Sequence, residues 1–301
     1  MRSLEPFVIE DIHEDNVLFR EAIDFTSAKT GFLPRLIEKD YFCTLLLTHL
    51  VTPDCSVVFK GGTCLAKVYA GFYRLSEDLD FAIPTPVSST RPERRLLSEG
   101  FKRAVQQIGA KPGIFRTVEP LAGANASTQY LITVGYLSVL NQREETIKIE
   151  VGLREPLLTP VFHGEARTIL LNPISGKPMV PGLDAPCISM EEAMAEKLRA
   201  ALSRREAAIR DFYDIDYAVR RLDFKPFEAS LLELVRQKVA VPGNEPVDVS
   251  GGRLAALKLQ VDSRLKPVLR KNDFSDFSLE RAFGIVAEVA GSIKIQHTEY
   301  L

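Results

Sequence analysis

The chain has 301 residues, of which 46% are hydrophobic and 26% are charged. This is the composition of a folded globular protein, and it excludes wholesale disorder. The length allows a full hydrophobic core and favours two domains over one. The formal net charge of -2 excludes a generally basic surface, so any contact with nucleic acid must come from a local basic patch.

The N-terminus and the cysteines indicate a cytoplasmic protein. The first residues, MRSLEPFVIEDIHEDN, carry acidic side chains where a secretion signal needs an uninterrupted apolar stretch. No later run approaches the length of a membrane span. The four cysteines lie far apart without C-x-x-C spacing, which is typical of reduced thiols. We therefore expect a cytoplasmic location and no contact with a membrane.

The first half of the chain mixes helices with strands. Pro34 begins an apolar-periodic stretch to Leu50 that predicts a helix. Residues 56–59 form a short predicted strand, which two glycines and a further helix follow. Alternating or β-branched residues predict strands over residues 79–83, 130–140 and 146–153.

The character of the sequence changes about two-thirds of the way along. Residues 159–186 contain five prolines and several glycines, which predicts a connecting segment with one strand around residues 168–171. The sequence Ser189-Met190-Glu191-Glu192 then has the S-x-x-E form of a helix capping box. Helical periodicity continues to the end of the chain, with one break over residues 241–252.

These patterns predict an α/β protein of the α+β kind. An N-terminal domain over residues 1–158 holds a small mixed sheet with helices before it. Residues 159–186 connect it to a mostly helical domain over residues 187–301.

The segment FKGGTCLAKVYAGFYRLSEDLDFAI, residues 59–83, carries the most informative pattern. Gly61 and Gly62 let backbone N–H groups approach a phosphate without obstruction by a Cβ. Thr63 can cap the helix whose positive end would face that anion. A double glycine alone, however, more often marks a simple turn.

Asp78 and Asp80 are the strongest candidates for a metal site. Side chains two apart on a strand share a face, so the two carboxylates point together while Leu79 and Phe81 point the other way. Such like charges repel unless a cation lies between them, and oxygen ligands of this kind suit Mg²⁺ that also holds substrate phosphates. The alternative is a half-exposed edge strand with solvated acids.

Glu150 offers a third carboxylate. Ile147, Ile149 and Val151 alternate with Lys148 and Glu150, which places Glu150 on the polar face of its strand. If this strand lies beside the one that carries Asp80, the three carboxylates make the arrangement that two-metal phosphoryl chemistry uses. Taken alone, Glu150 would be an ordinary surface residue.

Two charged residues lie on apolar helix faces in the second domain. Lys197 shares a helix face with Ala193 and Met194, so it must reach solvent or meet an anion such as a triphosphate. Asp211 aligns with the inner face of the next helix, where an unpaired carboxylate would be costly. A structural salt bridge between Lys197 and Asp211 is the alternative, because buried charges are usually paired.

A local basic patch could bind an RNA backbone. Its members are Arg199, Arg204, Arg205 and Arg210. A solvated helix face is the alternative on spacing alone. The sequence contains neither a G-x-S-x-G motif nor a P-loop, which excludes serine hydrolases of that type and P-loop ATPases.

With these residues in hand, the chain resembles the AbiEii/AbiGii toxin family of nucleotidyltransferases, including MenT-type toxins. The resemblance spans roughly residues 35–220. The matching motifs are, in chain order, Glu38-Lys39-Asp40-Tyr41, Phe59-Lys60-Gly61-Gly62-Thr63, Arg74-x-Ser76-x-Asp78-Leu79-Asp80-Phe81, Glu196-Lys197-Leu198-Arg199-Ala200 and Arg210-Asp211-Phe212-Tyr213-Asp214.

The resemblance implies a role for each matched residue. Asp78 and Asp80 would hold Mg²⁺ or Mn²⁺, Lys197 would bind the triphosphate, and Asp211 would assist at the catalytic centre. Glu150 resembles the third metal ligand, although many nucleotidyltransferases have Asp there. The implied nucleotide-binding residues are Gly61, Gly62, Thr63, Arg74, Ser76 and Lys197.

The resemblance also implies the reaction and the partners. A nucleotidyltransferase domain and the helical domain would form the active site between them. The enzyme would transfer a nucleoside monophosphate from an NTP to RNA, such as the 3′ end of tRNA, and release pyrophosphate. It would be the toxin of a toxin–antitoxin or phage-defence operon, with a separate antitoxin protein as partner. The alternatives are a small-molecule or protein acceptor, and an inactive nucleotide-binding module.

Overall fold

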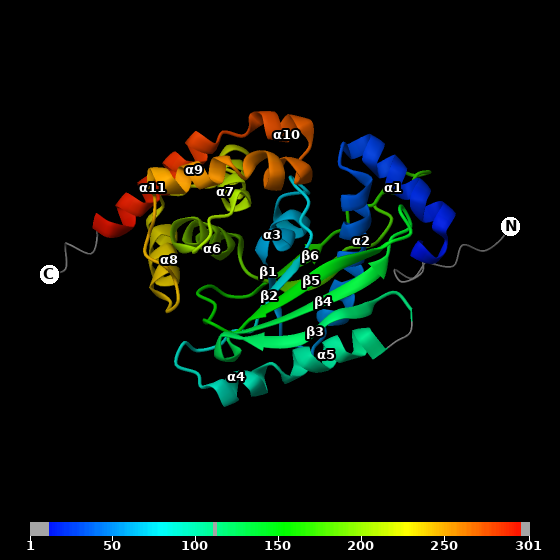
Figure 1. Ribbon diagram of the computed structural model, residues 1–301, viewed down its shortest axis with the longest axis horizontal. Helices are drawn as coiled ribbons and strands as arrows, with labels where there is room; N and C mark the ends of the chain where they lie inside the picture. The colour runs from blue at the N-terminus through cyan, green and yellow to red at the C-terminus, as the bar shows by residue number, and fades with distance from the viewer. Residues whose placement is uncertain (1–11, 111–112, 296–301) are drawn as a thin grey trace. The chain divides into compact units, whose positions relative to one another are not determined.

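The computed structural model describes residues 12–110 and 113–295, and the chain divides into two compact units (Figure 1). The first unit comprises residues 1–157 and 161–187, and the second comprises residues 158–160 and 188–301. Residues 1–11, which contain most of the segment expected not to be a secretion signal, lie outside the described residues. Within the described ranges, every helix is too short or too polar to span a membrane.

The first unit is built on one seven-stranded mixed sheet. In spatial order its strands are β3 (Arg116–Ala124), β4 (Gln129–Leu137), β5 (Glu144–Gly152), β2 (Leu79–Ala82), β1 (Val58–Lys60), β7 (Leu183–Cys187) and β6 (Phe162–Ala166). The pairs β2/β5 and β1/β7 are parallel, and the other neighbouring pairs are antiparallel. The predicted α/β class is therefore confirmed, with a larger sheet than expected.

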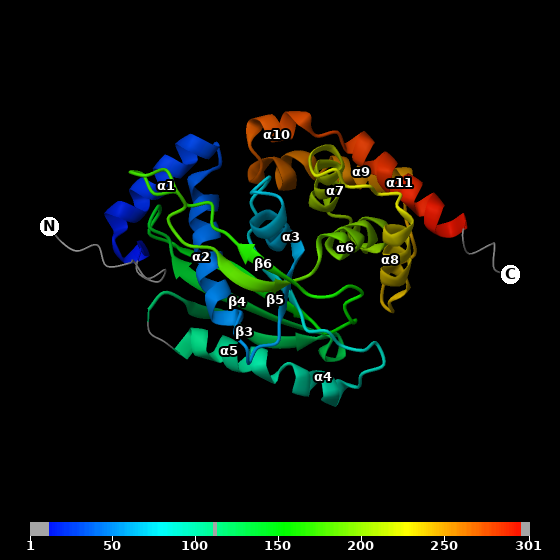
Figure 2. The ribbon, with the colours of Figure 1, turned by 180° about the vertical axis from the view of Figure 1, so that it is seen from behind.

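Helices cover one face of this sheet. In the first unit they are α1 (Asn16–Thr30), α2 (Pro34–Leu50), α3 (Gly61–Cys64) with a π-helical turn over Leu65–Tyr69, α4 (Arg91–Leu97) and α5 (Glu99–Ala110). The strands β3, β4 and β5 lie in front of α2 in Figure 1, and α2 lies in front of them in Figure 2, which is seen from behind. The bounds of α2 are those that the sequence predicts, because Pro34 is favoured in the first turn of a helix.

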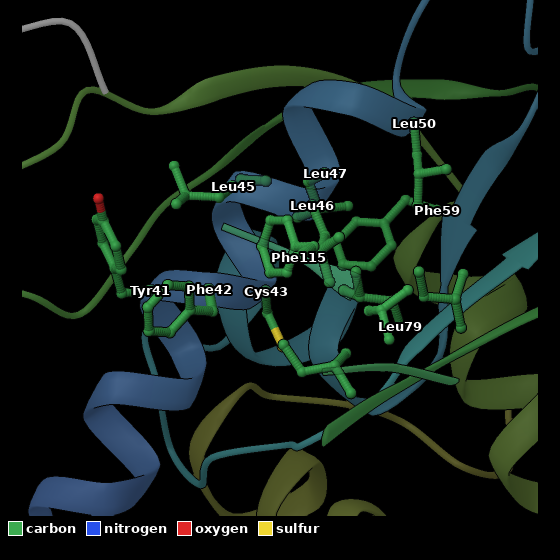
Figure 3. Packing of buried hydrophobic residues seen from close by; sticks show 14 of the residues in the cluster. Tyr41, Phe42, Cys43, Leu45, Leu46, Leu47, Leu50, Phe59, Leu79 and Phe115 are labelled. Atoms are coloured by element: carbon green, nitrogen blue, oxygen red, sulfur yellow. The ribbon is translucent and has the colours of Figure 1, made fainter. Parts of the chain in front are cut away.

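The hydrophobic core lies between α2 and the sheet. Of the 17 residues in α2, 13 are buried. Phe42 and Leu46 belong to one cluster with Phe59 and Leu79, and the Phe42 ring meets that of Phe115 edge-on (Figure 3). On β2, Leu79 and Phe81 are fully buried, whereas Asp80 and Ala82, which alternate with them, are half-buried. The strand alternation that the sequence predicts therefore sets which face of the sheet joins the core.

Because α2 is buried on most sides, its charged residues need partners inside the protein. The Asp40 carboxylate lies 2.6 Å from the Lys67 ammonium, and both side chains are almost fully buried. The Glu38 carboxylate accepts hydrogen bonds from the Ser138 hydroxyl and the Val139 N–H, each at 2.7 Å. Burial raises the pKa of Glu38, and these two hydrogen bonds oppose the shift.

The segment predicted to connect two domains instead contributes two strands to the first unit. The strands β6 and β7 pair antiparallel at one end of the sheet, and β7 pairs parallel with β1. Residues 168–171, where the sequence predicts a strand, hold only an isolated bridge from Leu171 to Pro178. Pairing with neighbouring strands, rather than local propensity, determines strand formation here.

The second unit is helical. Its helices are α6 (Met190–Ser203), α7 (Ile209–Arg221), α8 (Ala229–Ala240), α9 (Gly251–Lys258), α10 (Lys271–Asp276) and α11 (Leu279–Ile295), with short π- and 3₁₀-helical turns over Val261–Leu265 and Lys266–Val268. The predicted break over residues 241–252 matches the gap between α8 and α9.

The predicted capping box at the start of α6 is only half formed. The Ser189 hydroxyl accepts a hydrogen bond from the Glu192 N–H at 3.1 Å, as expected for an N-cap. The Glu192 carboxylate, however, accepts hydrogen bonds from the N–H groups of Leu158 and Thr159 and lies 2.7 Å from the Lys238 ammonium. A buried cation and two peptide N–H groups are stronger partners for this carboxylate than the N-cap N–H.

Candidate functional site

Asp80 lies on the sheet face opposite the core. It is one of the half-buried residues of β2, and its backbone pairs with Lys60 of β1 on one side and Glu150 of β5 on the other. Asp78 directly precedes β2 and is also half-buried. The sequence-predicted alternation of Asp80 with the buried Leu79 and Phe81 is present in the structure.

The double-glycine turn is shaped around two side chains. Gly61 has a φ of +76°, and a Cβ at this position would overlap the Asp80 carboxylate and lie 2.8 Å from its Cβ. At Gly62, a Cβ would overlap the guanidinium of Arg74. Because Arg74 is only 2% exposed, it supports the turn from within the protein. Both glycines are therefore needed for packing, whatever else they bind.

Thr63 joins this turn to the strand that carries the carboxylates. Its hydroxyl donates a hydrogen bond to the backbone carbonyl of Asp78 at 2.5 Å. The prediction that Thr63 caps the helix is wrong, because α3 begins at Gly61 and its N-cap, Lys60, makes no side-chain capping bond. Thr63 lies inside the first turn of α3, where its buried hydroxyl is directed to Asp78 instead.

The residue before Asp78 is anchored to α2. The Glu77 carboxylate lies 2.6 Å from the Arg35 guanidinium and 3.5 Å from the Lys39 ammonium. On the other side of the double-glycine turn, Asp40 of α2 binds Lys67 in the π-helical turn. The segment after the two glycines and the segment before Asp78 are therefore both attached to α2. Ser76 is half-buried within the same segment. Much of the motif over residues 38–41 therefore has a structural role.

Glu150 lies beside Asp80, as its proposed role requires. The two residues are register partners on the parallel strands β2 and β5. The Glu150 carboxylate accepts a hydrogen bond from the Gln129 amide at 2.6 Å and lies 3.6 Å from the Lys148 ammonium. Its side chain is 34% exposed. The two strands are therefore neighbours, which the sequence pattern alone left open.

The carboxylates of Asp78, Asp80 and Glu150 are the kind of oxygen ligand that hard divalent cations prefer. All three are carboxylates, and the absent side chain at Gly61 leaves room for that of Asp80. In the described residues, no three His, Cys, Asp or Glu side chains already converge on one point. At least one of Asp78, Asp80 and Glu150 would therefore need side-chain rotation for all three to coordinate one ion.

Lys60 is a member of this site that sequence analysis did not assign. It pairs with Asp80 across β1 and β2, so a cation, Asp80 and Glu150 follow one another on three adjacent strands. The feature of the sequence that could have pointed to Lys60 is its position at the end of a predicted strand, directly before the two glycines. Strand pairing, which a single sequence does not reveal, makes it a neighbour of Asp80.

In the second unit, Lys197 lies between two aspartates. Its ammonium is 2.8 Å from Asp211 and 2.9 Å from Asp214, and its side chain is 14% exposed. The salt bridge considered as an alternative is therefore present, with a second carboxylate that sequence analysis did not single out. The other oxygen of Asp211, Oδ2, is buried without a hydrogen-bond donor among the described residues. The Arg204 guanidinium lies 3.7 Å from this oxygen.

The four arginines of the predicted basic patch contact different partners. Arg204 and Arg205 are adjacent and exposed, with side-chain exposures of 58% and 86%. Arg205 pairs with Glu245 at 3.1 Å, and Arg199 is directed to Asn244. Arg210 is half-buried at the start of α7. Of the four, Arg204 and Arg205 are the exposed ones, and Arg199 is half-buried like Arg210.

Comparison with known proteins identifies the family. Residues 45–283 match the family described as nucleotidyl transferase AbiEii toxin, type IV TA system. The crystal structure of JHP933 from Helicobacter pylori shares the fold, with 17% sequence identity, coverage of 89% of this chain and 97% of that chain, and a TM-score of 0.50. A crystal structure of a candidate nucleotidyltransferase from H. pylori has 18% identity, coverage of 89% and 94%, and a TM-score of 0.44. No curated protein matches the sequence.

The matched range includes more than half of the chain, and it contains the carboxylates Asp78, Asp80 and Glu150 of the first unit and the group Lys197, Asp211 and Asp214 of the second. The chain therefore belongs to the AbiEii family of nucleotidyltransferase toxins from type IV toxin–antitoxin systems.

Proposed function

We propose that this nucleotidyltransferase uses Mg²⁺ or Mn²⁺ to transfer a nucleoside monophosphate from an NTP to an RNA acceptor, with the 3′ end of tRNA as the first candidate. An acceptor hydroxyl would form a bond to the α-phosphorus while the bond to the β-phosphate breaks. Pyrophosphate leaves, and the hydroxyl proton passes to a base or to water. The antitoxin of the type IV system is the expected protein partner.

The observation that carries this proposal is the placement of Asp80. Its carboxylate occupies the space left by Gly61 and is flanked by Glu150 on the next strand. Asp78 and Asp80 would hold the metal, with Glu150 as the third carboxylate. The bound metal would neutralise charge that develops on the phosphates.

The double-glycine turn would hold the phosphates of the nucleotide. The backbone N–H groups of Gly61 and Gly62 suit phosphate oxygens, and Thr63, Arg74 and Ser76 would support that cradle. Lys197 would bind the triphosphate through its ammonium group. The buried Asp211 Oδ2 supports a role for Asp211 toward a ligand, because a buried acceptor without a donor is costly unless a ligand supplies one.

Labelling of RNA tests the reaction. The purified protein is incubated with total cellular RNA, Mg²⁺ and each of the four NTPs labelled at the α-phosphate. We expect one or more NTPs to label RNA of tRNA size. Asp78→Asn and Asp80→Asn should each lower the rate by roughly three orders of magnitude, because several kcal/mol of charge stabilisation are lost.

Asp184→Asn is the matched control, because Asp184 lies on the same sheet and its side chain is 78% exposed. It should leave both the rate and the unfolding temperature unchanged. Retained turnover in either Asp78→Asn or Asp80→Asn would remove the metal assignment. Release of pyrophosphate without labelled RNA would favour a small-molecule or protein acceptor, and no turnover with any NTP would favour an inactive nucleotide-binding module.

A further inference from the structure

The hydrogen bond from Gln129 fixes the carboxylate of Glu150. Gln129 is the first residue of β4, and its side-chain amide donates to Glu150 Oε1 at 2.6 Å. Gln129 pairs with Gly152 across the strands, so it reaches Glu150 diagonally on the same sheet face. A partly exposed glutamate can adopt several rotamers, and this contact restricts them.

Asn125 in turn fixes the Gln129 amide. The Asn125 side-chain NH₂ donates to Gln129 Oε1 at 3.2 Å, so the NH₂ of Gln129 is directed to Glu150. Asn125 lies in a 3₁₀ turn over Asn125–Ser127, directly before β4. The two amides therefore form a directed chain that ends on the carboxylate beside Asp80.

The turn that carries Asn125 has a strained backbone. Asn125, Ala126 and Ser127 have φ values of +50°, +54° and +65°, a conformation that residues other than glycine rarely adopt. The Arg94 guanidinium of α4 donates to the Ala126 carbonyl at 3.2 and 3.3 Å, and the Leu153 N–H donates to the carbonyl of Thr128 at 2.8 Å. Such strain persists where surrounding contacts hold it, and it is concentrated at functional sites.

We infer that Gln129 is a positioning residue for the nucleotidyltransferase reaction and that it acts by holding Glu150 ready for metal coordination, with Asn125 and the strained turn as its support. The inference rests on the proposed role of Glu150 beside Asp80. A carboxylate that ligates a metal is commonly oriented by a hydrogen bond from a neighbouring group, and loss of that neighbour typically lowers metal affinity or activity by about 10- to 100-fold.

Gln129→Met tests the inference, because methionine keeps the length of the side chain but cannot donate to Glu150. We expect Mn²⁺ titrated into the nucleotide-free protein to bind about tenfold more weakly, and the Mg²⁺ concentration for half-maximal transfer to rise about tenfold. At saturating Mg²⁺, kcat of Gln129→Met should fall by less than tenfold relative to the wild type. In the Glu150→Gln background, Gln129→Met should have no further effect, since its action runs through Glu150.

Thr133→Val is the matched control. Thr133 lies on the same face of β4, and its hydroxyl donates to Glu119 at 2.6 Å, so the variant loses a side-chain hydrogen bond that does not involve Glu150. Metal affinity should stay unchanged. If Gln129→Met does not fold, Asn125→Ala tests the same chain, with an expected increase of a few-fold in the dissociation constant for Mn²⁺.

The outcomes separate this inference from the proposed function. Unchanged Mn²⁺ affinity in Gln129→Met, or an equal loss when Glu150 is already Gln, would overturn the positioning role. If Glu150→Gln binds metal like the wild type while Asp80→Asn is inactive, the inference fails and the proposed metal site on Asp80 stands. If Asp80→Asn keeps full turnover, the proposed function fails first.

Discussion

The Asp80 carboxylate occupies the position that a side chain at residue 61 would need, so Gly61 and Asp80 are a matched pair. This pairing predicts the effect of Gly61→Ala. The left-handed backbone at Gly61 costs an alanine about 1–2 kcal/mol, which lowers the unfolding temperature by a few degrees in a chain of this size. The new methyl group also displaces the Asp80 carboxylate, so transfer should fall by at least about tenfold, as misplacement of a reacting group implies.

Gly71→Ala separates these two effects. Gly71 has a φ of +57°, and a Cβ there would meet no other atom within 4 Å. The control therefore carries the backbone penalty without the clash. Thermal unfolding and steady-state rates are measured for both variants; an equal loss of activity in both would show that the Gly61–Asp80 contact does not matter for transfer.

Lys197 is predicted to bind the triphosphate in addition to its two aspartates. Lys197→Ala should weaken NTP binding by about tenfold or more, because one charge-assisted contact to phosphate is lost. It should also destabilise the second unit, since Asp211 and Asp214 then lose the ammonium that lies between them. Calorimetric titration of NTP and thermal unfolding measure the two effects.

Lys238→Met is the control for a purely structural lysine in the same unit. The Lys238 ammonium lies 2.7 Å from Glu192, and both side chains are almost fully buried. This variant should lose stability but keep NTP affinity. A Lys197→Ala protein that behaves in the same way would assign Lys197 to the salt bridge alone.

The exposed pair Arg204 and Arg205 is predicted to hold the RNA acceptor. Arg205→Glu should reduce RNA labelling while NTP affinity persists, because arginine donates to backbone phosphates. RNA binding should weaken steeply as the salt concentration rises. A plot of the logarithm of the binding constant against the logarithm of the salt concentration should have a slope of about -0.7 for each phosphate contact on a single strand. Arg204→Glu is a less specific test, because the new carboxylate would lie near that of Asp211 and would repel it.

Arg221→Glu is the control for this prediction. Arg221 is 56% exposed at the end of α7, and it pairs with Asp276 at 3.0 Å. Charge reversal there should leave RNA labelling unchanged. If Arg205→Glu labels RNA as well as Arg221→Glu does, the patch has no part in acceptor binding.

The buried pair of Lys67 and Asp40 is predicted to be essential for stability. Lys67→Met leaves the Asp40 carboxylate buried without its cation, which costs about 3–5 kcal/mol. The exposed pair of Lys225 and Asp223 gives the comparison, because Lys225→Met should change stability by at most about 1 kcal/mol. Denaturant unfolding of both variants measures the difference; similar midpoints would show that the Asp40 charge is compensated by other groups.

The four cysteines are predicted to differ in reactivity. Burial raises the pKa of Cys43 to about 12 and that of Cys55 to about 11, whereas a hydrogen bond with Cys64 lowers the pKa of Cys187. All four thiols are buried, so alkylation of the native protein should be slow, and where local opening of the fold admits the reagent Cys187 should react before Cys43 at mildly alkaline pH because the thiolate is the nucleophile. Mass spectrometry of iodoacetamide-treated native protein gives the order, and early labelling of Cys43 would contradict it.

The local pattern of the sequence was sufficient for the central parts of the fold. Pro34 and an apolar-periodic run define α2, and alternation around Asp80 and Glu150 defines β2 and β5, because these signals depend only on neighbours along the chain. The resemblance on the motifs around Gly61, Asp80 and Lys197 led to the family that the comparison confirms.

Other elements were not predictable in this way. The strand β3 is exposed along most of its length and contains Pro120 and Gly123, so it lacks an apolar alternation. The strands β6 and β7 lie in a proline-rich segment. Each of these strands exists because a neighbouring strand supplies its backbone hydrogen bonds, and a single sequence carries no record of that neighbour.

The sequence by itself determined which residues carry charge and on which face of its own strand or helix each one lies. Only the tertiary structure decided which of them meet. Strand register places Glu150 and Lys60 on either side of Asp80, and helix packing brings Asp214 to Lys197. The reason is physical: local periodicity fixes the direction of a side chain, whereas its partners depend on contacts between segments far apart in the chain.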